Sequence, residues 1–220
     1  MFHVIPNLLD TREIARLREL AARMPFEDGR HSNPGFSKKK NLQPKHSDPG
    51  YKEASLIVQQ GLSRNEYFRD FTYPKTMAPP MLSKYEAGME YGEHVDNAII
   101  PYSPPLRIDV SCTVFVSEPE SYEGGELVVR MADKELKIKE KAGAAVLYPS
   151  NMFHHVAPVT KGTRLVAITF IESMVRDTQK REILVELTEF LHANAAKVGE
   201  DEHVRLEYIR QNLTRMWYAD

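Results

Sequence analysis

Cysteine is almost absent from this chain, whose 220 residues include one, Cys112. A single thiol excludes an intramolecular disulfide, so the fold is held together without one. Because Cys112 lies within an apolar, strand-like run, we expect it to be a core residue and not a nucleophile. In this respect the sequence fits a reducing cytoplasm.

Long apolar runs and a large charge of either sign are absent as well. No stretch approaches the ~20 apolar residues that a membrane-spanning helix needs, and 29 basic against 31 acidic residues leave a formal net charge of −2. We therefore expect no membrane partner and no nucleic-acid partner. Residues 1–10 lack the basic and apolar regions of a secretory signal, so we expect a cytoplasmic protein.

Short strands dominate the middle of the chain. From Met81 apolar and polar residues alternate between turn residues, most clearly in Leu106–Val116, where Ser111 and Thr113 fall on the face that we expect to line a polar cavity. This spacing, with no helices between the strands, predicts an antiparallel sandwich or barrel, for which a jelly roll is the natural candidate. The runs predicted as strands are residues 81–85, 106–116, 126–130, 136–139, 144–148 and 163–171.

Helical patterns flank these strands. Asp10 or Thr11 can cap a helix that runs to about Met24, with Glu13 placed for a capping box. Residues 53–71 predict a second helix. Beyond Ser173 two amphipathic segments follow, which could cover the core or pair with a second copy of the chain to give a homo-oligomer.

These patterns together predict an α+β fold. We expect residues 1–80 to form N-terminal helices and a loop packed on the core. Residues 81–173 are expected to form a double-stranded β-helix (jelly-roll) core, and residues 174–220 a C-terminal helical extension. The length is sufficient for one domain with a sizeable core and such an appendage.

The composition shifts between the two N-terminal helices. Residues 27–51 are rich in Gly, Pro, Ser, Lys and His and include Lys38-Lys39-Lys40. Such stretches are typical of surface loops, and we expect these lysines to be solvated. The alternative is that residues 29–51 form a mobile lid that meets a substrate.

A pair of candidate metal ligands, His94 and Asp96, stands in Tyr91-Gly92-Glu93-His94-Val95-Asp96. Two positions apart on an extended strand, their side chains point to the same face. If the fold brings a second imidazole to them, the site has two histidines and one carboxylate, the arrangement of non-haem Fe(II) oxygenases. Alone, the triplet carries little information, because it arises by chance in many chains.

A second segment supplies the missing imidazole. His154 is followed by Val156, by Pro158-Val159, and ten positions on by Arg164. With the first segment, this pattern resembles the 2-oxoglutarate-dependent oxygenases of the prolyl 4-hydroxylase type. Over nearly the whole chain the sequence resembles the bacterial PKHD-type hydroxylases, the PiuC/YbiX family. The segments that carry this closer resemblance are residues 28–30, 91–98, 107–111, 122–127, 147–150 and 173–177.

The resemblance implies that His94, Asp96 and His154 hold Fe(II) and that Arg164 binds the distal carboxylate of 2-oxoglutarate. A buried carboxylate needs a cationic partner, and a guanidinium offers it a bidentate fork. The alternative for Arg164 is an outward-facing strand position paired with Glu126 or another acid.

Tyr85 and Tyr91 are candidate residues of the cosubstrate pocket, with packing in the core as the alternative. His155 should point to the opposite face of a strand from its neighbour His154, so only one of the two is expected to bind the metal. The resemblance to the family motif, with Val156 and Pro158-Val159 after the histidine, implies that this is His154. The chain departs from the family at Phe170, where a tryptophan is usual, and this leaves the pocket wall in doubt.

The resemblance implies an Fe(II)- and 2-oxoglutarate-dependent dioxygenase that hydroxylates a C–H bond of an organic substrate with O2, releasing succinate and CO2. L-ascorbate would act as reductant, and the family suggests a role near bacterial iron uptake. A peptidyl substrate and a siderophore-like small molecule are equally open. Two alternatives are a non-enzymatic jelly-roll module or sensor that binds a metal or ligand, and a zinc hydrolase that uses Glu93 as general base.

Overall fold

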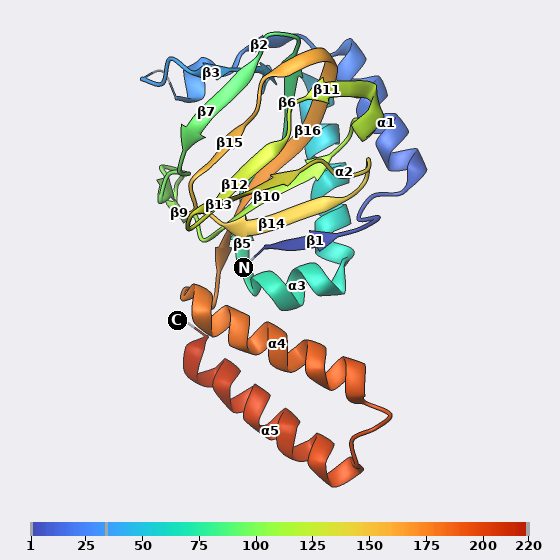
Figure 1. Ribbon diagram of the computed structural model, residues 1–220, viewed down its shortest axis with the longest axis vertical. Helices are drawn as coiled ribbons and strands as arrows, with labels where there is room; N and C mark the ends of the chain where they lie inside the picture. Colours follow the sequence, from blue (N-terminus) through green and yellow to red (C-terminus); the bar gives the residue numbers. More distant parts are fainter. Residues whose placement is uncertain (1, 34, 219–220) are drawn as a thin grey trace.

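The computed structural model describes residues 2–33 and 35–218 of the chain. At its centre two antiparallel sheets are stacked face to face, helices cover the outer face of the larger sheet, and a helical hairpin projects from one end (Figure 1). This is the predicted α+β architecture, with a jelly-roll core and helices at both ends of the chain.

The larger sheet is built around the long strand β16. Its order is β1-β14-β10-β16-β6-β4-β2, and β11 and β5 also pair with β16, always antiparallel. The strands of this sheet are β1 (His3–Ile5), β2 (Phe26–Asp28), β4 (Leu42–Pro44), β5 (Pro74–Met77), β6 (Met81–Glu86), β10 (Val110–Phe115), β11 (Tyr122–Gly124), β14 (Ala145–Pro149) and β16 (Val159–Ser173).

The smaller sheet has the order β13-β12-β15-β7-β3 and carries the two candidate metal segments on its adjacent strands β7 and β15. Its strands are β3 (Lys39–Lys40), β7 (Glu90–His94), β12 (Leu127–Met131), β13 (Lys134–Ile138) and β15 (His154–Val156). A separate pair joins β8 (Ile99–Ile100) to β9 (Leu106–Arg107).

The strand predicted over residues 106–116 is interrupted in the structure. It forms β9 and then β10, because the Asp109 carboxylate between them accepts hydrogen bonds from the Arg107 guanidinium and from the backbone N–H of Ser173. Within β10, the side chains lie on the two faces of the strand that the alternation predicted. Ser111 and Thr113 line a cavity between the sheets, and Cys112 on the opposite face is buried in the core, where burial raises the pKa of its thiol.

The N-terminal helices lie against the outer face of the larger sheet (Figure 1). Helix α1 (Thr11–Arg23) begins as predicted, with Asp10 and Glu13 forming a reciprocal capping box. The single helix predicted over residues 53–71 is wrong. The chain forms α2 (Pro49–Arg64) and α3 (Glu66–Thr72), because the Asn65 side chain accepts a hydrogen bond from the backbone N–H of Phe68 and starts a new helix.

Two apolar cores pack on either side of the larger sheet, and a third, small cluster forms around Tyr85. The larger core fills the space between α1, α2 and the larger sheet. The smaller core lies between the sheets, where Phe115, Leu127 and Val166 pack together. Leu127 and Tyr148 belong to this core and also line the polar cavity, so the core borders the cavity directly.

The C-terminal hairpin consists of α4 (Thr178–Asn194) and α5 (Glu200–Trp217). Helix α4 is anchored by the buried Arg181, whose guanidinium donates to the backbone oxygens of Val175 and Arg176. Helix α5 has no buried side chain. Within residues 2–33 and 35–218, no helix has the length and apolar character needed to cross a membrane.

Candidate metal centre

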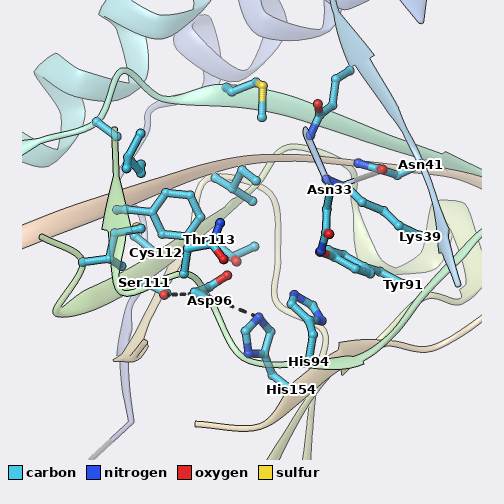
Figure 2. A pocket seen from close by; sticks show the side chains of 18 of the residues that line it. Asn33, Lys39, Asn41, Tyr91, His94, Asp96, Ser111, Cys112, Thr113 and His154 are labelled. Carbon is cyan, nitrogen blue, oxygen red and sulfur yellow. Dashed lines mark hydrogen bonds and ion pairs between the residues drawn. The ribbon is translucent and has the colours of Figure 1, made fainter. Parts of the chain in front are cut away.

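Strand pairing brings the three predicted ligand residues together. His94 ends β7 and lies directly opposite His154 on β15, and Asp96 follows two residues beyond His94. One ligand atom from each of the three side chains lies within 4.8 Å of the others. Among the described residues this is the group of His, Cys, Asp and Glu side chains that could hold a metal ion, and Figure 2 shows it at the base of the cavity.

The backbone fixes which nitrogen of each imidazole is available. His94 Nδ1 lies 2.8 Å from the carbonyl oxygen of Gly92, and His154 Nδ1 lies 3.0 Å from that of Met152. A carbonyl oxygen only accepts, so each Nδ1 carries the proton and each Nε2 keeps its lone pair for a metal. In both cases the acceptor is the residue two positions earlier, so each strand orients its own ligand.

The carboxylate of Asp96 is held by a hydroxyl group of the facing sheet. Ser111 Oγ donates to Asp96 Oδ2 at 2.5 Å and lies 2.7 Å from Ser150 Oγ. Asp96 Oδ2 is 3.7 Å from His154 Nε2, which leaves space for a cation between them. The buried hydroxyl pair therefore sets the orientation of the carboxylate.

Burial keeps the imidazole of His94 neutral. Desolvation, helped by the nearby His154, lowers the pKa of His94 to about 3. A neutral imidazole is the form that binds a metal. Burial also raises the pKa of Asp96, while His154 and the hydrogen bond from Ser111 act in the opposite direction.

The three side chains open into a cavity of about 380 Å³ between the sheets. Arg164, Tyr85, Tyr91 and Phe170 line it as well, so the structure places every sequence-predicted site residue around one space. Tyr91 stacks on His94 with ring centroids 3.7 Å apart. Phe170, at the position where the family usually has tryptophan, completes part of the wall.

Arg164 is a buried cation beside this cavity. Its residue surface is 1% exposed, and its guanidinium carbon lies 5.0 Å from the centre of the Tyr85 ring, on the neighbouring strand β6. Its Nε has no hydrogen-bond partner among the described residues, and no carboxylate there forms an ion pair with it. The alternative of an outward-facing arginine paired with Glu126 is therefore wrong. A buried, incompletely bonded guanidinium fits an anionic ligand.

Lys39 is a cavity residue that the sequence analysis missed. We expected residues 38–40 to be solvated, but Lys39 is 5% exposed and lines the cavity, with Nζ 5.2 Å from the centre of the Tyr91 ring. The reason is that β3 pairs with β7, which turns this side chain between the sheets. The alternation of Lys39, Asn41 and Gln43 was the signal that could have shown it.

Two other expectations can be compared with the geometry. His155 lies outside the cluster and pairs with Val128 on β12, as its position on a strand predicted. Glu93 points away from the cavity, where its half-exposed carboxylate pairs with Arg130. Glu93 is therefore not positioned to act as the general base of a zinc hydrolase.

The residues fit the groups that the family would place here. Two Nε2 atoms and one carboxylate form the facial donor set of non-haem Fe(II) sites, with remaining positions open toward the cavity. Arg164, in the same cavity, fits the distal carboxylate of a chelating dicarboxylate such as 2-oxoglutarate.

Known proteins that resemble this chain indicate the class of enzyme to which it belongs. Residues 80–172 match the model of the 2OG-Fe(II) oxygenase superfamily. A prolyl hydroxylase from Trichoplax adhaerens, solved in complex with a peptide fragment of the hypoxia inducible factor, shares the fold with a TM-score of 0.57. The alignment has 18% identity and covers 83% of this chain and 86% of the other. The family match, together with the shared fold, assigns the chain to the class of 2-oxoglutarate- and Fe(II)-dependent oxygenases.

Full-length relatives define the family. A PKHD-type hydroxylase of Sphingopyxis alaskensis is 42% identical over 218 residues, covering 99% of both chains. The PKHD-type hydroxylase YbiX of Shigella boydii is 36% identical, covering 99% of this chain and 98% of that protein. The chain belongs to the PKHD-type hydroxylases, as its sequence motifs predicted. It is an oxidoreductase that uses O2 and an organic substrate, so the prediction of an enzyme holds over that of a non-enzymatic binding module.

Proposed function

We propose that His94, Asp96 and His154 hold Fe(II), that Arg164 binds the distal carboxylate of 2-oxoglutarate, and that the enzyme hydroxylates a C–H bond of its substrate. The observation that carries this proposal is the presence of a donor triad and a buried, incompletely bonded arginine in one cavity. A metal alone does not account for Arg164, since a cation repels a cation.

The overall reaction balances with one molecule of each reactant. O2 gives one oxygen atom to succinate, formed with CO2 from 2-oxoglutarate, and the other to the substrate, which changes from R–H to R–OH. When bound, Fe(II) supplies the activation of O2 that no amino-acid side chain provides.

The residues of the chain supply binding, orientation and exclusion of water. The carbonyls of Gly92 and Met152 hold the two imidazoles, and Ser111 holds the carboxylate. Tyr85 is fully buried beside Arg164, and we assign both to the cosubstrate pocket together with Tyr91. Burial of this pocket strengthens the pairing between a carboxylate and Arg164.

The finer parts of the proposal rest on the family resemblance. The hydroxylated molecule is a peptidyl group or a siderophore-like small molecule, and L-ascorbate keeps the metal reduced. We also propose that the enzyme acts in the cytoplasm and has a role related to bacterial iron uptake. The peptide bound by the Trichoplax enzyme supports the first type of substrate only by analogy of fold.

Turnover without a known substrate gives a direct test. Purified protein with Fe(II), 2-oxoglutarate and O2 should form succinate in step with O2 consumption, measured by NMR and an oxygen electrode. Asp96→Ala should abolish this, because the donor set loses its carboxylate. Asp133→Ala, in an exposed turn between β12 and β13, is the matched control and should retain it. Succinate formation by Asp96→Ala at the native rate would remove Asp96 from the metal site.

A further inference from the structure

Asp109 is a buried carboxylate at the break between β9 and β10, and it lies outside the donor triad. Its side chain is 8% exposed. The carboxylate accepts hydrogen bonds from the Arg107 guanidinium at 2.8 Å and from the backbone N–H of Ser173 at 2.8 Å. A buried carboxylate is stable with such partners, and here they come from β9 and from the end of β16. Two strands therefore fix the position of Asp109.

The backbone of Asp109 leads from this ion pair to the metal site. Its N–H donates to the carbonyl oxygen of Ile171 at 3.0 Å, and its carbonyl oxygen accepts from the N–H of Ser150 at 3.2 Å. Ser150 follows directly after β14 and is 4% exposed. Its carbonyl oxygen accepts in turn from the N–H of Asp96 at 3.3 Å. Two backbone hydrogen bonds on either side of Ser150 thus connect Asp109 to a candidate metal ligand.

The side chain of Ser150 reaches the same ligand by a second route. Ser111 has a single hydroxyl proton, which it donates to the Asp96 carboxylate, because an ionised carboxylate only accepts (Figure 2). Across the 2.7 Å contact between the two serine hydroxyls, Ser150 is therefore the donor. Hydrogen bonds that follow one another in one direction polarise and strengthen each other. Ser150 consequently holds Asp96 both at its backbone and, through Ser111, at its carboxylate.

We propose that Asp109 is a positioning residue for the metal centre: it fixes Ser150, and Ser150 sets the place and the orientation of the ligand Asp96. This role rests on the proposed function, since it presupposes that the triad binds a metal. Asp109 is not one of the three candidate donor residues, so it acts through Ser150.

Glu172 offers a comparison within the same group of charges. Its carboxylate also pairs with the Arg107 guanidinium, at 3.6 Å, and with Lys75 at 3.4 Å. At 7% exposed it is buried like Asp109. Among the described residues the two acids differ in one respect, because the backbone of Asp109 bonds to Ser150 and that of Glu172 does not. Substitution of each acid separates damage to the ion cluster from displacement of the metal ligand.

Asp109→Asn and Glu172→Gln form the matched pair of variants, since each removes one charge and keeps the shape of the side chain. Co(II), a coloured divalent ion that accepts the same nitrogen and oxygen donors, serves as the probe. Its affinity is measured by competition with a chelator, and its visible ligand-field spectrum is recorded at saturation. In Asp109→Asn the affinity should fall by roughly 10-fold, as for loss of a group that orients a metal ligand. The bands should shift as well, whereas Glu172→Gln should keep the native affinity and bands.

A double variant tests the path through Ser150. Ser150→Ala should weaken Co(II) binding, because Ser111 loses its hydrogen-bond donor. Together with Asp109→Asn, the loss of affinity should be smaller than the product of the two separate losses, since part of what Asp109 holds is then missing. A full product would mean that the two residues act independently, and the proposed path would be refuted.

The spectrum distinguishes positioning from a general loss of stability, which does not move the bands of folded, metal-saturated protein. Folded Asp109→Asn with native affinity and bands would overturn the proposal, and so would an equal shift in Glu172→Gln. If Asp109→Asn does not fold, Arg107→Lys decides by the same two measurements, because lysine keeps the charge beside Asp109 but lacks the bidentate fork. Native Co(II) binding that survives His154→Ala would count against the proposed function itself, whereas a normal centre that is insensitive to Asp109→Asn counts against this inference alone.

Discussion

At the scale of single residues, the site depends on which atom each side chain presents. His94 and His154 each donate a hydrogen bond from Nδ1 to the carbonyl oxygen two residues earlier. The backbone therefore orients both imidazoles, with each Nε2 available to the metal, and no carboxylate is needed to hold either ring. The Asp96 carboxylate instead accepts a hydrogen bond from Ser111, whose Oγ lies next to that of Ser150. The serines are therefore the positions where a substitution can disturb the site without removing a ligand.

Ser111→Ala should weaken Fe(II) binding by roughly 10-fold, the low end of the effect of losing a group that orients a metal ligand. The fold should be retained, because alanine fits where serine stood. Fe(II) affinity by anaerobic competition with a chelator, together with circular dichroism, measures both. Ser121→Ala, an exposed serine beyond β10, serves as the control. Unchanged affinity in Ser111→Ala would show that Asp96 is oriented without this hydroxyl.

Arg164→Met should weaken 2-oxoglutarate binding by roughly 10-fold to 100-fold, because the distal carboxylate loses a charge-assisted hydrogen bond in a buried pocket. Fe(II) affinity should change little, since Arg164 is not one of the three candidate donor residues. Arg130→Met, at an exposed arginine that pairs with Glu93, is the matched control. Equal 2-oxoglutarate affinity in native and Arg164→Met protein would refute this role.

Local patterns reveal some site residues and conceal others. The spacing of His94 and Asp96 showed that they share a face, and the motif around His154 supplied their partner. Lys39 was concealed because a short polar segment with three lysines looks the same whether it is solvated or pairs with β7. The alternation of Lys39, Asn41 and Gln43 could indicate a strand, but not its partner, because the pairing joins residues about fifty positions apart.

At the scale of elements, β16 connects the cosubstrate residue to the remainder of the fold. It pairs with β6, β10, β5 and β11, and the register that places Arg164 opposite Tyr85 depends on these pairings. The pairing of β11 requires close backbone contact. A Cβ atom on Gly124 would lie 2.1 Å from the carbonyl oxygen of Pro158, and the residue has a φ of +70°.

Gly124→Ala should therefore destabilise the fold by more than Gly88→Ala. Both glycines have positive φ, but a Cβ on Gly88 would meet nothing within 4 Å. Gly88→Ala should cost about 1–2 kcal/mol from backbone conformation alone, and Gly124→Ala should exceed this because backbone atoms must move. Urea unfolding of both variants gives the comparison. Equal free energies of unfolding for the two variants would mean that the backbone around Gly124 in β11 accommodates the extra Cβ atom without strain.

Element types were easier to predict than element ends. Alternation predicted the strands of the core, and the capping box predicted the start of α1. The predicted second helix was wrong at both ends, because Asp48 and Pro49 start α2 earlier and Asn65 separates α3. The break at Asp109 depends on Ser173, a contact distant in sequence that alternation does not reveal.

At the scale of the whole molecule, the C-terminal hairpin stands apart from the catalytic sandwich (Figure 1). Val204, Tyr208 and Met216, spaced by multiples of four along α5, are 63%, 70% and 75% exposed. The division into residues 1–80, 81–173 and 174–220 stays a prediction. So does the pairing of this helix with a second copy of the chain.

We expect the native protein to sediment as a homo-oligomer that is held together through α5. Tyr208→Asp should shift it toward the monomer, because a charge in an apolar contact is costly. Lys197→Asp, in the exposed connection between α4 and α5, should leave the sedimentation unchanged. A native monomer at micromolar concentration in analytical ultracentrifugation would contradict this expectation.

The central claim is that His94, Asp96 and His154 form a metal centre that binds 2-oxoglutarate beside Arg164. The most direct measurement is an anaerobic absorption titration of the metal-free protein with Fe(II) and then 2-oxoglutarate. We predict a saturable visible charge-transfer band that is lost in His154→Ala and kept in His155→Ala. Folded native protein that shows no band, or a band that survives His154→Ala, would contradict the account.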